Sequence, residues 1–186
     1  TTSSYMYGPI YRSAATSTFN YSRYAYIFTA AELNIPAGSI ITQIEWQRAT
    51  NATISGSNTF EILLANNSAT TLATGTAWST LSAGATSVYS NSAQTWSAVT
   101  AGSWEAYPCN AFIYTGGSLQ VMTDHVKSGT ASAALPYYYT AAAGKAIGYS
   151  NSVALTGATT LTTDVWYHVD FTSNGTTTSC YLNGAP

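Results

Sequence analysis

Short runs of β-branched and aromatic residues recur along this chain between clusters of Gly, Asn and Ser, and they constrain its fold more than any other feature. Helical periodicity is almost absent. The clearest run covers residues 40–48, where apolar and polar side chains alternate as they do on a half-buried strand. One row holds Thr42, Ile44 and Trp46, and the other holds Gln43, Glu45 and Gln47. The pattern predicts an all-β fold, an antiparallel β-sandwich.

The boundaries of the expected elements follow from these runs and from the turn residues between them. Strands are predicted at residues 21–29, 40–48, 59–66, 87–90, 104–106, 119–126, 146–149 and 165–171. Thr29 and Glu32 have the spacing of a capping box, which predicts one short helix at residues 30–33 that ends before Pro36. Residues 72–81 and 128–145 are the least regular stretches.

A single domain is expected over residues 1–186, because a chain of 186 residues can bury a core of its own. Residues 172–179 have the composition of a linker, rich in Thr, Ser, Asn and Gly. Residues 180–186 then form either a last edge strand or the lead into another module.

Charge is scarce in this chain. Only 6% of the residues are charged, against about 25% in an ordinary soluble domain, while Ser and Thr supply about a quarter of the chain. Hydroxyl groups therefore replace charges in wetting the surface, which indicates an extracellular or cell-surface protein. A formal net charge of −2 disfavours nucleic acid as a partner. No long apolar stretch predicts a membrane span, and the chain starts without a signal peptide, as expected if one had been removed.

Two cysteines, Cys109 and Cys180, lie too far apart for a redox motif and are too few for a metal cluster. Three interpretations remain open. The cysteines form a structural disulfide in an oxidising compartment, they are two buried thiols, or one is a reactive thiol.

Several segments carry a resemblance to a known group of proteins. The segments are residues 7–13 (YGPIYRS), 19–24 (FNYSRY), 29–33 (TAAEL), 35–44 (IPAGSIITQI), 112–121 (FIYTGGSLQV) and 151–155 (NSVAL). Together they resemble the β-sandwich, jelly-roll-like modules of large secreted surface proteins of Bacteroidetes, many of them exported by the type IX route. The resemblance implies a location outside the cell and a non-catalytic role beside adhesins, polymer-degrading enzymes or surface fibres. It implies no active-site residue.

The acidic residues and histidines predict no catalytic site. The seven acids include no evident converging pair, and no nucleophile elbow accompanies His125 or His168. Asp124 and His125 are adjacent on a predicted strand, so they should point to opposite faces. We expect no cofactor, with structural calcium at Asp124 and Asp164 as the alternative.

Aromatic residues are unusually frequent in this chain, which contains fifteen Tyr and five Trp. Trp46 and Trp166 are expected in the core. A ring platform for a glycan or a protein partner is predicted from Trp78, Trp96, Tyr137, Tyr138 and Tyr139, which lie in or beside loops.

The leading functional hypothesis is a structural or adhesive module of a bacterial surface protein or fibre, acting through protein–protein contacts, with other subunits or further copies as partners. The alternative is a carbohydrate-binding module in which the ring platform holds a surface glycan.

Overall fold

The computed structural model describes residues 3–5, 8–10, 21–54, 57–128, 135–140, 142–150, 169–173 and 178–182. The chain divides into two compact units, Thr1–Asn151 and Ser152–Pro186. The second unit contains β10 (Val169–Ser173) and β11 (Thr178–Leu182), which pair only with each other among the described strands. Four residues of the expected linker, those at 172, 173, 178 and 179, therefore belong to an antiparallel pair.

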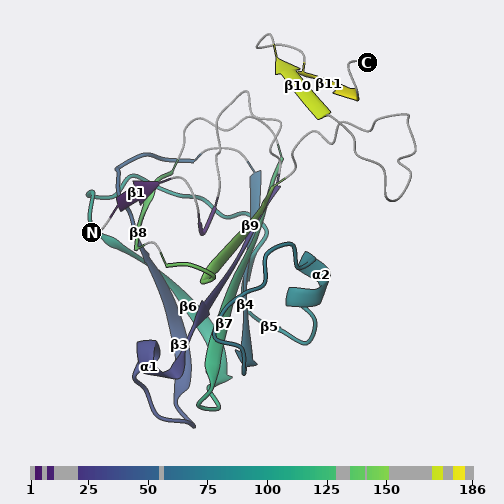
Figure 1. Cartoon of the computed structure of the whole chain (residues 1–186). Coiled ribbons are helices and arrows are strands. Elements are labelled where there is room, and N and C mark those ends of the chain that lie inside the picture. The colour runs from purple at the N-terminus through teal and green to yellow at the C-terminus, as the bar shows by residue number, and fades with distance from the viewer. Residues whose placement is uncertain are drawn as a thin grey trace, which may run out of the picture. The chain divides into compact units, whose positions relative to one another are not determined.

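The first unit holds two facing antiparallel sheets. The larger sheet contains β2 (Tyr21–Phe28), β4 (Ser57–Asn67), β5 (Thr86–Asn91), β7 (Ser118–Ser128) and β9 (Ala146–Ser150), in the order β5-β4-β7-β2-β9. The smaller sheet pairs β3 (Ile40–Gln47) with β6 (Trp104–Ile113). Figure 1 shows β3 and β6 on one side of the larger sheet and the short helix α2 (Trp78–Leu81) on the other. The predicted all-β sandwich is confirmed.

The order of strand pairing defines the topology as jelly-roll-like. β4 pairs with β5, β3 with β6 and β2 with β7, so the pairs are nested along the chain like the two arms of one long hairpin. The hairpin is rolled so that β4 also lies beside β7. This places β2 and β3, which are consecutive in the sequence, in different sheets, as in a double-sheet jelly roll.

Side-chain alternation explains how the larger sheet buries both of its faces. On β4, Phe60, Ile62 and Leu64 point to the smaller sheet and are fully buried in the main core. Leu63 on the same strand points to the other face, where Met122 and Ala25 form a second cluster beneath α2. Because β4 buries apolar side chains on both of its faces, the larger sheet is the middle one of three layers, between the smaller sheet and α2.

Most predicted elements are present, with a few corrections. Helix α1 (Ala30–Leu33) is confirmed, and the Thr29 N–H donates to the Glu32 carboxylate at 2.7 Å. β6 extends to Ile113, well beyond the expected residue 106, because Pro108 lies beside a register shift where its missing N–H interrupts no regular ladder. The sequence did not predict α2, or the pairing of β1 (Ser3–Tyr5) with β8 (Tyr137–Tyr139). Residues 165–168 of the last predicted strand lie outside the described residues.

Candidate binding cleft

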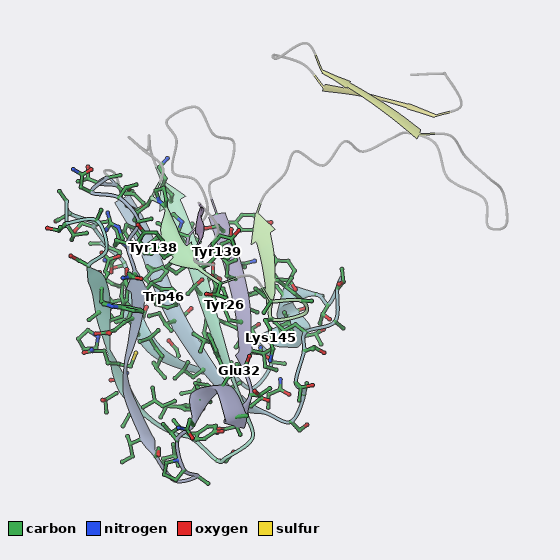
Figure 2. All side chains as sticks on the ribbon, turned by 60° about the vertical axis from the view of Figure 1, so that its left-hand side comes forward. Tyr26, Glu32, Trp46, Tyr138, Tyr139 and Lys145 are labelled. Atoms are coloured by element: carbon green, nitrogen blue, oxygen red, sulfur yellow. The ribbon has the colours of Figure 1, made fainter. Side chains whose placement is uncertain are left out.

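A partly open cleft of about 1400 Å³ lies where β2 and β9 of the larger sheet face β3 of the smaller one. Figure 2 shows Tyr138 and Tyr139 at one end of this region and Glu32 with Lys145 at the other, with Tyr26 and Trp46 between them. Its lining includes the aromatic residues Tyr24, Tyr26, Trp46, Trp104, Tyr138 and Tyr139 and the polar residues Glu32, Gln43, Glu45, Gln47 and Lys145. The cleft is therefore rich in rings and poor in charge.

The aromatic walls of the cleft come from both sheets. On β2, the rings of Tyr24 and Tyr26 are stacked, with centroids 6.0 Å apart and planes 13° apart. On β3, Trp46 is half-buried and meets Tyr107 of the core edge-on at 5.5 Å. Trp104, at the start of β6, is 62% exposed. Tyr24 itself is buried, so among these rings it is the exposed Trp104 that is best placed to stack on the C–H face of a sugar.

A row of amide and carboxylate side chains lies at the rim of the cleft, on the face of β3 that carries Trp104's neighbour Gln47 and opposite to the face that carries Trp46. Gln43, Glu45 and Gln47 alternate along β3, and the cleft lining includes all three. The Gln43 amide donates to Glu45 Oε1 at 2.7 Å, and the Gln47 amide donates to Gly102 O at 2.9 Å. Gln47 lies directly opposite Trp104 in the β3·β6 pair, so planar polar groups lie next to the most exposed ring.

An ion pair closes the other end of the cleft. Lys145 Nζ lies 2.7 Å from Glu32 Oε2, and the same oxygen accepts hydrogen bonds from Thr29 N and Oγ1. The hydrogen bond from Lys145, followed by those from Thr29, lowers the pKa of Glu32 from 4.5 to about 2. The Glu32 carboxylate is therefore ionised at physiological pH, and its charge offsets that of the neighbouring ammonium group.

Glycine allows the Tyr24 ring to lie flat against the sheet. A Cβ at Gly148 on β9 would lie 2.7 Å from Tyr24 Cε1, closer than real Cβ atoms come. Gly148 and Tyr24 are direct cross-strand partners, so the ring covers the glycine. The position of the cleft wall thus depends on the absence of one side chain.

The predicted ring platform does not exist as a single site. Trp96 and Tyr137 are each only 1% exposed, so their prediction as binding residues is wrong; both fill the core between the sheets. Trp78 lies on α2 and packs edge-on against Tyr149 at 5.7 Å, in the cluster on the far face of the larger sheet. Of the five residues of the predicted platform, only Tyr138 and Tyr139 line the cleft with exposed side chains.

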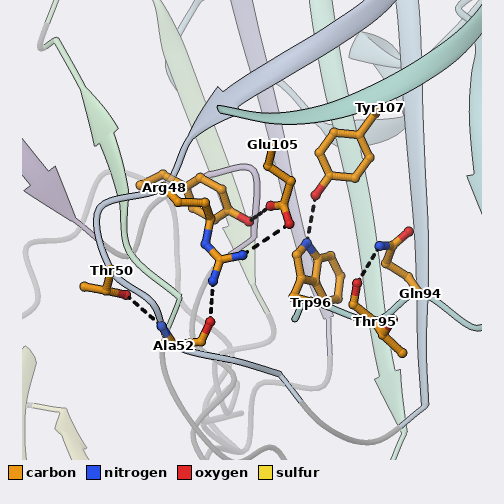
Figure 3. Close-up of polar contacts among 9 residues, drawn as sticks. Arg48, Thr50, Ala52, Gln94, Thr95, Trp96, Glu105 and Tyr107 are labelled. Carbon is orange, nitrogen blue, oxygen red and sulfur yellow. Dashed lines mark hydrogen bonds and ion pairs between the residues drawn. The ribbon is translucent and has the colours of Figure 1, made fainter. Parts of the chain in front are cut away.

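Tyr137 belongs to a polar network around Arg48, and both side chains are buried. Figure 3 shows Arg48 and Glu105 at the centre of this network. Arg48 Nη1 lies 3.2 Å from Glu105 Oε1, and the Tyr137 hydroxyl donates to Glu105 Oε2 at 2.9 Å. Arg48 Nη2 also donates to the Ala52 carbonyl oxygen. Burial raises the pKa of Tyr137 well above its ordinary value. The network fixes β3, β6 and β8 to one another, and a buried charge pair of this kind is costly to break.

A serine and a histidine do meet in the structure, but away from the cleft. Ser22 Oγ lies 3.3 Å from His125 Nδ1, and His125 Nε2 lies 3.0 Å from Asn58 Oδ1. All three side chains are buried, and none lines the cleft. Burial lowers the pKa of His125 to about 4. Without access for a substrate, this arrangement joins β2, β7 and β4 rather than activating a nucleophile.

Of the two predicted calcium ligands, Asp124 lies in the described part of the chain. Asp124 forms an ion pair with Arg23 at 2.8 Å, and burial raises the pKa of its carboxyl group. In the described part of the chain, no group of three or more His, Cys, Asp or Glu side chains could hold a metal ion. Asp164 lies outside the described residues. As expected, Asp124 and His125 lie on opposite faces of β7.

Cys109 is half-buried and forms no disulfide within the described part of the chain, and its thiol donates to Tyr107 O at 3.2 Å. Burial raises the pKa of this thiol, which disfavours the reactive thiolate. Cys180 lies on β11 of the second unit, where no side chain is described. The disulfide between them stays a prediction.

Trp46, Trp104 and the Gln43 row were not predicted as site residues. The signal was present in the alternation of residues 40–48, which assigns Gln43, Glu45 and Gln47 to one face of one strand. The sequence pattern could not show that this strand borders an open cleft, because that depends on which other strands lie beside it.

Comparisons of the chain with protein-family models, with curated proteins and with solved structures found no match. Among the described residues, no helix has both the length and the apolar character needed to cross a membrane.

Proposed function

We propose that this chain is a non-catalytic extracellular module that binds carbohydrate at the mouth of the cleft, along the edge of β3 that no described strand covers along most of its length. The observation that carries the proposal is the pairing of the exposed Trp104 ring with the neighbouring row of Gln43, Glu45 and Gln47. Sugar recognition needs a flat apolar surface for the ring face together with planar hydrogen-bonding groups for the hydroxyls. The low charge of the chain and its resemblance to bacterial surface modules support a location outside the cell.

Binding to a panel of immobilised polysaccharides tests this proposal. Replacing Trp104 by alanine should weaken binding by about fivefold, since a stacked ring contributes about 1 kcal/mol. Trp104→Phe keeps an aromatic face and should retain part of the affinity. Ile113→Ala is the matched control, because Ile113 is 63% exposed on the same strand but does not line the cleft. Failure of every polysaccharide to bind the unaltered protein would refute the proposal.

The second candidate is a structural unit of a surface fibre, assembled by contacts between copies of the chain. Ile40 and Ile113 are cross-strand partners that are 61% and 63% exposed, and they extend an apolar surface at one end of the smaller sheet. Exposed apolar pairs at a sheet edge favour association. Light scattering over a range of concentrations tests it: association that Ile113→Asp abolishes would support the fibre unit, and a strict monomer at high concentration would refute it.

A further inference from the structure

The described wall of the cleft contains three charged side chains, Glu32, Glu45 and Lys145. Lys145 is the one cation among them, and its ammonium group is 2.7 Å from the Glu32 carboxylate. That carboxylate is held ionised by three hydrogen bonds, from Lys145 Nζ, Thr29 N and Thr29 Oγ1. An incoming anion would have to share Lys145 with the Glu32 carboxylate, whose negative charge already offsets that of the ammonium group, so the described wall of the cleft offers no net positive charge.

Glu45 gives the cleft a negative charge that no ion pair in the described part of the chain offsets. Its side chain is exposed, and Oε1 accepts a hydrogen bond from the neutral Gln43 amide. A carboxylate in this position repels another anion but accepts hydrogen bonds from hydroxyl groups readily, since a charged acceptor forms the stronger bond. The neutral amides of Gln43 and Gln47 on either side leave its charge in place.

On these grounds we propose that the cleft selects uncharged glycan chains and discriminates against chains that carry carboxylate or sulfate groups. The inference rests on the proposed carbohydrate binding and names its ligand class. An acidic sugar would stack on Trp104 as its neutral counterpart does, yet it would meet Glu45, on the same face of the smaller sheet, without a compensating cation. Rejection by an unfavourable charge is a common source of specificity in binding sites.

The experiment compares matched pairs of ligands on the full chain. Each neutral polysaccharide of the panel is tested beside the same polymer oxidised at C6 to the carboxylate, so that linkage and chain length are shared. The neutral member should bind about tenfold more tightly, and the difference should shrink as added salt screens the repulsion. Equal or tighter binding of the oxidised member would overturn the inference while leaving carbohydrate binding intact. If neither member of any pair binds, the proposed function itself fails.

Glu45 supplies the second arm of the test. Glu45→Gln keeps the size and the hydrogen-bonding shape of the side chain but removes its charge. The ratio of neutral to oxidised binding should fall severalfold in this variant, chiefly because the oxidised polymer binds better. Glu61→Gln is the control, because Glu61 lies on β4 outside the cleft. A ratio that does not move with Glu45→Gln, or that moves equally with Glu61→Gln, would contradict the role assigned to Glu45.

Discussion

The space between the two sheets is filled in one half and open in the other, although aromatic residues dominate both. In the filled half, the rings of Phe60, Trp96 and Tyr107 pack against one another at 5.2 to 5.5 Å, between β4, β7 and β6. In the open half, Tyr24 and Tyr26 of β2 face β3, and a cleft of about 1400 Å³ remains. The same type of side chain therefore forms core or cleft wall according to whether a facing strand covers it.

The smaller sheet explains the difference. It has two long strands, β3 and β6, against five in the larger sheet. The residues before β6 bring Trp96 inward, where its Nε1 donates to the Tyr107 hydroxyl at 2.8 Å. Along most of β3 no further described strand continues the sheet toward β9. Two strands cannot cover five, and the uncovered part of the larger sheet becomes a wall of the cleft.

Trp96→Ala should produce the largest effect, because it empties the filled half. Removing a fully buried ring costs about 3–5 kcal/mol of unfolding free energy. Urea unfolding followed by circular dichroism measures the loss. Trp104→Ala is the matched control from the open half and should change stability by no more than about 0.5 kcal/mol, since Trp104 is 62% exposed. Similar losses in the two variants would contradict the division into a filled and an open half.

Acid should weaken the filled half through His125. Its pKa is lowered from 6.5 to about 4, chiefly because burial disfavours the charged ring. Above pH 6.5 the imidazole is neutral in both the folded and unfolded states, so stability does not depend on it. Between pH 6.5 and 4 the unfolded state takes up a proton that the folded state does not, and stability falls by about 3 kcal/mol before levelling off.

The measurement is the pH dependence of unfolding free energy in the unaltered chain minus that in His125→Gln. The subtraction removes contributions from other groups, including Asp124, whose raised pKa acts in the opposite direction. A difference that does not change between pH 6.5 and 4 would show that His125 is not buried as a neutral group.

The sequence predicted the fold better than the site, and the reason is visible at particular residues. Alternation over residues 40–48 located β3 and assigned its two faces, because that pattern is local. Thr29 and Glu32 likewise predicted α1, since a capping box spans only four residues. Both features depend on neighbours in the chain.

Exposure of the rings could not be predicted in the same way. Trp96 follows a loop-like stretch and was expected at the surface, yet Phe60, Tyr107 and His125, all distant in sequence, enclose it. Trp104 begins a predicted strand and is exposed, because nothing in the described part of the chain covers the outer face of the smaller sheet at that position. Burial of an aromatic side chain is set by tertiary pairing, which a local pattern does not contain.

Gly148→Ala should have a smaller effect, and its effect should fall on the open half. The added Cβ would lie 2.7 Å from Tyr24 Cε1, so the ring must move off the sheet into the cleft. We expect a loss of about 1 kcal/mol in unfolding free energy, at the lower end for overpacking because the open side gives the ring room. Glycan binding should weaken at the same time. In a Tyr24→Leu background the alanine should cost less, and a fully additive double-mutant cycle would contradict the contact.

Lys145→Gln should change stability least, yet it tests most directly the ion pair between Lys145 and Glu32 at the end of the cleft. The Lys145 hydrogen bond is the largest cause of the low pKa of Glu32, so its removal should raise that pKa from about 2 toward 4.5. The two Thr29 hydrogen bonds remain and should keep the pKa below 4.5. A lowered carboxyl pKa stabilises the fold above pH 4.5, and this contribution disappears as the pH falls toward 2.

The pKa of Glu32 can be followed by NMR titration of its side-chain carboxyl carbon. Lys145→Arg keeps a cation at the same position and should leave the pKa low. Because the carboxylate is at the surface, its pairing adds little to folding, and the thermal midpoint should hardly move. An unchanged pKa in Lys145→Gln would mean that the ammonium group does not hold Glu32, and the cation would then be free to meet an anionic sugar. That result would remove the electrostatic basis for selecting uncharged chains while leaving the stacked rings of the open half in place.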